Sequence, residues 1–386
     1  MIKVKKQLGE VSIFIVIFFA LLITVVIVSF ISIMVKTQQQ ANTVDLSQSA
    51  FDSAQAGVED AKRALLRLQS ICDTGSAADC ALAKSQFNTS ACNSEVKKLL
   101  DVAAAESNNE VKVQTQTGVG SILDQAYTCV KISLDTVDYL GTLSADESKM
   151  IPLNGTGPFN TVKIEWFNSD NLNSDDNFSV DLQPGSSSSW PLLARNSWKP
   201  SRPPILRTQL IQFGSGFKLS DLDNTINGES DANTLFLYPS ASNSNDVKVV
   251  KDRDLRKTAT GAPLPVSCLS DLTAGGYSCS ASLQLPAPIG GGARTAFLRL
   301  GALYNKTSYR VTLQNDAQAV KFNAVQPTID STGRANDLFR RVQTRVELID
   351  VNFPYPDAEL DITGNLCKTF LITDNVADYK AGSCTP

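Results

Sequence analysis

The sequence predicts an α+β protein in which a long N-terminal helix precedes a β-rich region. Three observations support this fold class. Residues 11–35 form an uninterrupted apolar run, residues 51–72 carry an apolar stripe at helical spacing, and later segments alternate apolar and polar residues as strands do. With 386 residues, the chain is long enough for one large or two modest domains beyond an anchor.

The apolar run at residues 11–35 predicts a membrane-spanning helix. It contains no charged residue, and at about 1.5 Å per residue it would be about 37 Å long, enough to span a ~30 Å hydrocarbon core. A cleavable secretory signal has a shorter apolar region, on the order of 7–15 residues. Lys3, Lys5 and Lys6 precede the run, and only Lys36 follows it closely. We therefore expect a single-pass protein of the cytoplasmic membrane, with its N-terminus inside and the remainder extracytoplasmic.

The helix is expected to continue beyond the membrane as an amphipathic spine. Apolar or small residues recur at steps of three and four, which places them on one helical face: Phe51, Ala54, Val58, Ala61, Leu65, Leu68 and Cys72. Proline is absent from the first 151 residues, so a single rod over residues 10–71, about 90 Å long, is allowed. A juxtamembrane coiled coil is the alternative interpretation of the stripe.

Residues 72–386 are predicted to form a β-rich head. Residues 92–106 favour a short helix with Asn93 or Ser94 as its N-cap. Strands are expected near residues 111–113, 130–134, 162–166, 205–213, 234–238, 277–285, 296–304, 309–313 and 342–348, with a hairpin turn at 305–307. A loop rich in serine and proline, residues 183–204, is the candidate internal boundary of the head.

The cysteines favour disulfides in an oxidising compartment, because an even number of them lies at wide spacings with no close C-x-x-C pair. The eight are Cys72, Cys80, Cys92, Cys129, Cys268, Cys279, Cys367 and Cys384. A bond between Cys268 and Cys279 would close a short loop across Gly275 and Gly276. The four early cysteines allow three pairings, which stay open, and small buried thiols are the alternative.

The sequence offers no catalytic constellation. It has no histidine, no phosphate-binding G-x-x-x-x-G-K-[ST] loop and no G-x-S-x-G elbow, so we expect no enzyme activity and no cofactor. The net charge of −4 does not favour a nucleic-acid partner. Acidic residues cluster at 170–176 and 221–231 without the spacing of an EF-hand, and we interpret them as solvated loops rather than calcium sites. Trp166, Trp190 and Trp198 are expected in cores or loop anchors rather than on a binding face.

The N-terminal residues resemble those of a type IV pilin. The leader MIKVKKQLG is short, basic and ends in glycine, and Glu10, an apolar helix and an amphipathic helix follow it. Residues 49–68, SAFDSAQAGVEDAKRALLRL, are similar to the signature after the membrane helix in PilX-type minor pilins. The matched positions are Ala50, Phe51, Ala54, Ala56, Gly57, Glu59 and Ala61, whereas Gln55 replaces the usual glutamate. Residues 329–348 resemble the strand that these proteins carry near the C-terminus.

The resemblance implies a minor pilin that contributes to filament assembly, priming or tip adhesion. A prepilin peptidase would remove residues 1–9 by cleaving between Gly9 and Glu10, and pilus assembly machinery would bring the subunit together with major and other minor pilins. The outer half of the helix would pack on the sheet of the head, and Cys367 with Cys384 would staple the C-terminal segment. Phe14 stands where most pilins have glutamate, which favours a tip or minor subunit. A type II secretion pseudopilin and a membrane-anchored envelope adhesin without a filament are the alternatives.

Overall fold

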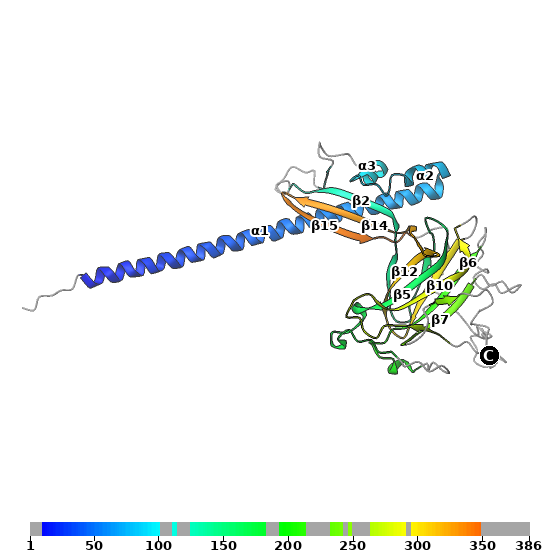
Figure 1. The fold of residues 1–386 in the computed structure, drawn as a ribbon. Coiled ribbons are helices and arrows are strands. Elements are labelled where there is room, and N and C mark those ends of the chain that lie inside the picture. Colours follow the sequence, from blue (N-terminus) through cyan, green and yellow to red (C-terminus); the bar gives the residue numbers. More distant parts are fainter. Residues whose placement is uncertain are drawn as a thin grey trace, which may run out of the picture. The chain divides into compact units, whose positions relative to one another are not determined.

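The computed structural model describes residues 10–100, 110–113, 124–182, 193–213, 232–241, 246–248, 263–290 and 295–348. One long N-terminal helix and a β-rich body make up this part of the chain, so the predicted α+β class is confirmed (Figure 1). Two compact units are formed. The helical unit comprises residues 1–133 and 328–346, and the β unit comprises residues 134–327 and 347–386. Residues 193–204 of the expected boundary loop belong to the β unit, and residues 183–192 lie outside the described residues.

The helical unit begins with α1 (Glu10–Thr74), a single α-helix of 65 residues. At the standard rise it is about 100 Å long. The helix ends at Gly75, whose N–H donates to the carbonyl of Ile71. Next comes α2 (Ala77–Lys84), where Ser76 and Asp79 form a capping box that satisfies free N–H groups of the first turn. The helix expected at residues 92–106 is present as α3 (Ser94–Leu100), and residues 101–109 lie outside the described residues.

A four-stranded sheet packs beside the second half of α1 (Figure 1). Its order is β1 (Val111–Lys112), β2 (Ala126–Thr136), β14 (Phe322–Ala335) and β15 (Leu338–Arg345). The segment expected to hold one strand near the C-terminus is an antiparallel hairpin of β14 and β15. The chain reverses at Asn336, whose positive φ of 50° suits a tight turn. β15 ends at Arg345, three residues before the end of the strand expected at residues 342–348.

The described residues of the β unit form two further sheets. The six-stranded sheet has the order β13 (Gln318–Val320), β12 (Thr307–Asn315), β5 (Phe159–Asn168), β10 (Tyr277–Ile289) and β8 (Asp246–Lys248), with β3 (Tyr139–Leu143) also paired to β12. The five-stranded sheet has the order β4 (Ser148–Pro152), β11 (Thr295–Leu303), β6 (Ile205–Phe213), β7 (Ala232–Ser240) and β9 (Leu264–Ser267). In the described connections lie the short 3-10 helices η2 (Ser169–Asn171), η3 (Ser174–Asp176) and η4 (Arg195–Ser197).

Among the described residues of the β unit, apolar side chains from both sheets pack together in a shared core. The period-two alternation explains which side chains enter it: Val162, Ile164 and Trp166 of β5 are buried, and so are alternate residues of β12. The expected hairpin at residues 305–307 is wrong, because β11 and β12 belong to different sheets. The amide of Asn305 donates to the carbonyls of Lys199 and Arg202, each at 2.8 Å, so this turn is tied to a neighbouring loop while the chain changes sheets.

Candidate functional site

The first part of α1 exposes a continuous apolar surface. Every side chain in residues 13–35 is exposed, and this stretch is long and apolar enough to cross a membrane. Two of its three hydroxyl groups donate back to the helix itself: Thr24 to the carbonyl of Leu21 and Ser29 to that of Val25, both at 2.8 Å. Because these hydroxyl groups are already hydrogen-bonded within the helix, they do not need water as a partner. The surface is therefore suitable for contact with lipid or with apolar helices.

The second part of α1 is buried on one face. The residues with at most 3% of their surface exposed recur at helical spacing: Ala50, Ser53, Ala54, Val58, Ala61, Ala64, Leu65 and Leu68. Phe51 departs from the sequence interpretation, because 42% of its surface is exposed and Ala50 occupies the buried face instead. At 100° per residue, adjacent positions lie far apart around a helix, so a one-residue difference moves a side chain to another face.

Small residues allow α1 to approach the sheet closely. A Cβ on Gly57 would collide with the hydroxyl of Ser331 and would lie 2.8 Å from Cγ2 of Val130. A Cβ on Gly333 of β14 would collide with the backbone of Ala50 and Ala54. This proximity lets the buried hydroxyl of Ser331 donate to the carbonyl of Ala54 at 2.7 Å. The glycines therefore set the distance between helix and sheet.

Two polar contacts fix how α1 lies on the sheet. The hydroxyl of Tyr127 in β2 donates to Asp60 at 2.9 Å, and Nε of Arg340 in β15 donates to the hydroxyl of Ser47 at 2.7 Å. Burial of Tyr127, together with the nearby charge of Asp60, raises the pKa of its phenol well above the usual range. Ser47 precedes the buried stretch and Asp60 lies within it, so the two contacts hold α1 at two separate points and restrict its sliding and rotation.

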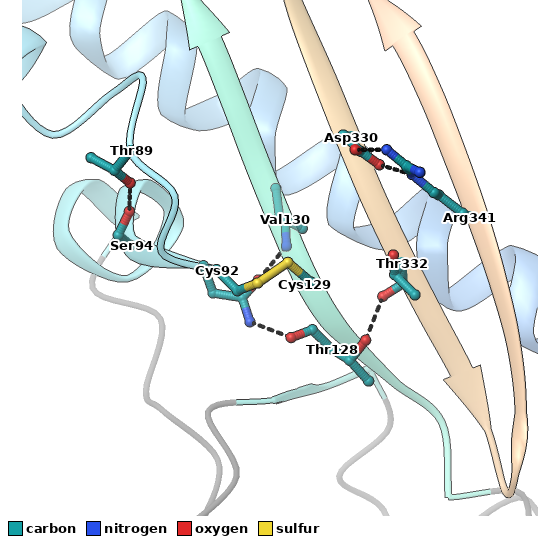
Figure 2. The surroundings of a disulfide bond; sticks show 10 residues. Thr89, Cys92, Ser94, Thr128, Cys129, Val130, Asp330, Thr332 and Arg341 are labelled. Carbon is teal, nitrogen blue, oxygen red and sulfur yellow. Dashed lines mark hydrogen bonds and ion pairs between the residues drawn. A yellow bond between two sulfur atoms is a disulfide. The ribbon is translucent and has the colours of Figure 1, made fainter.

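Disulfides hold the segments that follow α1. Cys72 at the end of α1 is bonded to Cys80 of α2, and Cys92 is bonded to Cys129 of β2 (Figure 2). Asn93 is fully buried beside the second disulfide. Its side-chain oxygen accepts from the N–H of Val130 at 2.7 Å, and its side-chain amide donates to the carbonyl of Thr128 at 3.2 Å. The side chain expected to cap a helix therefore joins the loop before α3 to the strand.

Of the two later disulfides that were expected, one is confirmed and one cannot be compared with the structure. Cys268 and Cys279 form the disulfide expected across the turn at Gly275 and Gly276, and both glycines have positive φ. Cys367 and Cys384 lie outside the described residues. Gly9 does too, and Glu10 is the first residue of α1.

Metal-ligating side chains lie apart in the part of the chain that the structure describes. No three residues among histidine, cysteine, aspartate and glutamate gather there as a metal site. Tyr139 is 2% exposed and donates to Glu347 at 2.9 Å, and its burial raises the pKa of its phenol well above the usual range. Trp166 is fully buried, and Trp198 stacks on Tyr304 with 4.5 Å between ring centroids. Trp190 lies outside the described residues.

Comparisons with protein-family models, with curated proteins and with solved structures found no match.

Proposed function

We propose that this chain is a minor pilin of a type IV pilus, of the PilX-like kind, which contributes to filament assembly, priming or tip adhesion. The observation that supports the proposal best is the two-part character of α1. One uninterrupted helix exposes apolar side chains over residues 13–35 and buries its later residues against a disulfide-linked sheet. Such a helix can serve in lipid first and among other apolar helices later, while the head stays attached.

The proposal places the newly made subunit in the cytoplasmic membrane. The apolar stretch would cross the bilayer once, and the lysines before it would keep the N-terminus in the cytoplasm. Residues after the stretch would then lie in an extracytoplasmic, oxidising space, where the three disulfides of the described residues persist. The proposal requires no catalytic residue or cofactor in the chain.

Release from the membrane requires partners. A prepilin peptidase would cut between Gly9 and Glu10, and the pilus assembly machinery would transfer α1 from lipid into a bundle of pilin helices. Burial among helices would cover the side chains that α1 exposes, which supplies the driving force once the helix has left lipid. Major pilins and other minor pilins are therefore the proposed partners, and the head would face outward.

Substitution of the leader glycine tests this function. Gly9→Val should block cleavage. The variant should therefore keep the mass of the full chain and be absent from sheared filaments. Gln7→Ala, in the same leader but away from the cut, should be processed and assembled normally. Equal processing and location of the two variants would refute the pilin proposal.

The location of the head separates the alternatives. Immunogold labelling of a tagged head should mark fibre tips or fibres if the chain is a minor pilin. Label confined to the bare cell surface, together with no effect of Gly9→Val on the mass or location of the protein, would favour an envelope adhesin. A processed protein that never enters surface fibres would favour a secretion pseudopilin.

A further inference from the structure

Four asparagines of the chain stand in the pattern Asn-x-Ser/Thr, in which asparagine can accept an N-linked saccharide. This modification requires a hydroxyl side chain two residues after the asparagine and occurs on surface loops of exported proteins. The four are Asn88, Asn154, Asn177 and Asn305. So short a pattern often arises by chance, but the structure shows which of these side chains is available to react.

Two of the four asparagines already use their amide groups in the fold. The amide of Asn305 donates to the carbonyls of Lys199 and Arg202, each at 2.8 Å. The amide of Asn154 donates to the carbonyl of Asn323 at 3.0 Å. Transfer of a saccharide to either nitrogen would have to break these bonds first, so neither asparagine is suited to be the acceptor.

Asn88 is exposed, but the residue itself is tied to the sheet of the helical unit. Its N–H donates to the carbonyl of Ile132 in β2 at 3.1 Å. Four residues later, the disulfide between Cys92 and Cys129 joins the same segment to the same strand. An enzyme that binds an acceptor asparagine must contact its backbone, and these bonds hold that backbone on β2.

Asn177 lies at an exposed tight turn that follows η3 in the β unit. Its backbone has φ 45° and ψ 47°, and that of Phe178 has φ 60°. The N–H of Ser179 donates to the carbonyl of Asp176 at 2.9 Å, as in a type I′ turn. Asn177 and Ser179 are both exposed, and neither side chain has a hydrogen-bond partner in the part of the chain that the structure describes. The amide nitrogen and the hydroxyl that the reaction requires are therefore both accessible.

The neighbouring loop holds this turn without using the side chain of Asn177. The N–H of Leu272 donates to the carbonyl of Phe178 at 3.0 Å. The disulfide between Cys268 and Cys279 closes the loop that contains Leu272. The turn is therefore anchored through its second central residue, while the first presents its amide to solvent.

A saccharide at Asn177 would also cover apolar surface that the fold leaves in water. Phe178 has 48% of its surface exposed, and Leu269 of the neighbouring loop has 58%. A positive φ is unusual for a bulky residue, so the turn holds Phe178 in a strained position in which its ring gains little packing. A linked saccharide is bulky and solubilising, and its attachment to the adjacent residue would shield this ring.

We propose that Asn177 is the acceptor of an N-linked saccharide, which a transferase moves from a lipid-linked diphosphate donor outside the cytoplasm. The amide nitrogen of Asn177 attacks C1 of the first sugar and forms the N–C1 bond. The bond between C1 and the diphosphate oxygen breaks, and the diphosphate leaves with the electron pair. The nitrogen loses one proton to a base of the transferase. This modification goes beyond the pilin function and shares with it only the extracytoplasmic location of the β unit.

The mass of the protein isolated from its own cells tests this site. The full chain would be extracted from membranes, and the intact mass and the mass of the peptide that contains Asn177 would be measured. We expect a saccharide on this peptide. Asn177→Gln and Ser179→Ala should each lose the added mass completely, because one removes the acceptor and the other removes the required hydroxyl. Ser179→Thr keeps a hydroxyl at that position and should keep the saccharide.

A matched control for Asn177→Gln is Asn173→Gln. Asn173 is exposed in the same loop but has no serine or threonine two residues later, so this variant should keep the saccharide. A bare Asn177 in the wild-type protein would overturn the inference. So would a saccharide on one of the other three asparagines in its place, or one that persists in Ser179→Ala. Gly9→Val changes only the leader and should keep the saccharide, so this proposal and the pilin proposal fail separately.

Discussion

Gly333 in β14 lies over the backbone of α1, where a methyl group would collide with Ala50 and Ala54. We therefore expect Gly333→Ala to lower the free energy of unfolding of the helical unit by about 3 kcal/mol, the upper range for overpacking. Denaturant unfolding followed by the helical circular-dichroism signal would measure it. Gly157→Ala is the control, because no atom lies within 4 Å of its Cβ, and it should stay within ~0.5 kcal/mol of wild type. Equal costs would show that the helix does not lie this close.

Tyr127 makes the helical unit sensitive to alkali. Burial and the charge of Asp60 raise the pKa of its phenol in the folded state. Below pH ~10 the folded and unfolded states both keep the proton, whereas at higher pH only the unfolded state loses it. Stability should therefore fall as pH rises above ~10, by up to ~1.4 kcal/mol per pH unit from this residue. Tyr127→Phe should flatten the slope in a pH series of denaturant melts, and an unchanged slope would contradict the burial of Tyr127.

Individual residues show where sequence interpretation was sufficient. Burial of Ala54, Val58 and Leu65 follows from helical periodicity alone. Phe51 is apolar and lies three residues before Ala54, so helical spacing assigned it to the stripe, but it lies at the edge of the buried face and 42% of its surface is exposed. The role of Asn93 could not be predicted from the local sequence, because its side chain bonds to Val130 of β2, which lies 37 residues further along the chain.

At the scale of elements, α1 is held by its buried face. Leu65 is fully buried, whereas 63% of the surface of its neighbour Leu66 is exposed. Leu65→Ala should lower the unfolding free energy by about 3 kcal/mol through lost burial and a cavity. Leu66→Ala has the same chemistry and similar helix propensity and should change it by less than ~0.5 kcal/mol. The two variants would be compared in denaturant melts. Equal losses of unfolding free energy, or a larger loss for Leu66→Ala, would show that α1 is rotated differently.

The two disulfides of the helical unit should contribute unequally. Cys92 and Cys129 are separated by 37 residues, and Cys72 and Cys80 by 8. Loop-closure entropy predicts that replacing both cysteines of a pair by serine costs about 4 kcal/mol for the longer loop and about 2.5 kcal/mol for the shorter. Thermal melts of the two double variants should show the larger decrease for Cys92 and Cys129. The reverse order would indicate that the longer loop is already restricted in the unfolded chain.

Element type was predictable from periodicity, and element pairing was not. Residues 309–313 alternate apolar and polar side chains, and they lie within β12, Thr307–Asn315. The hairpin expected at residues 305–307 failed because adjacent strands can enter different sheets, and their partners lie far along the chain. The pairing of the early cysteines has the same origin. β2, which follows a long connection, brings Cys129 to Cys92, and no local spacing encodes that approach.

For the molecule as a whole, the proposed function requires that α1 be a single helix whose first part and later part lie in different surroundings. The exposed apolar part and the buried later part belong to a single helix, Glu10–Thr74, so changing the surroundings of the first part need not unfold the second. This property is expected of a subunit that is stored in a membrane and then assembled. It is not required of a protein that is only anchored there.

The N-terminal residue of the assembled protein tests this account most directly. Filaments would be sheared from cells that express the full chain, and the protein would be sequenced from its N-terminus and its intact mass determined. The account predicts a chain that begins at Glu10, recovered in the filament fraction. An intact Met1 in that fraction, or a chain found only in membranes, would contradict it.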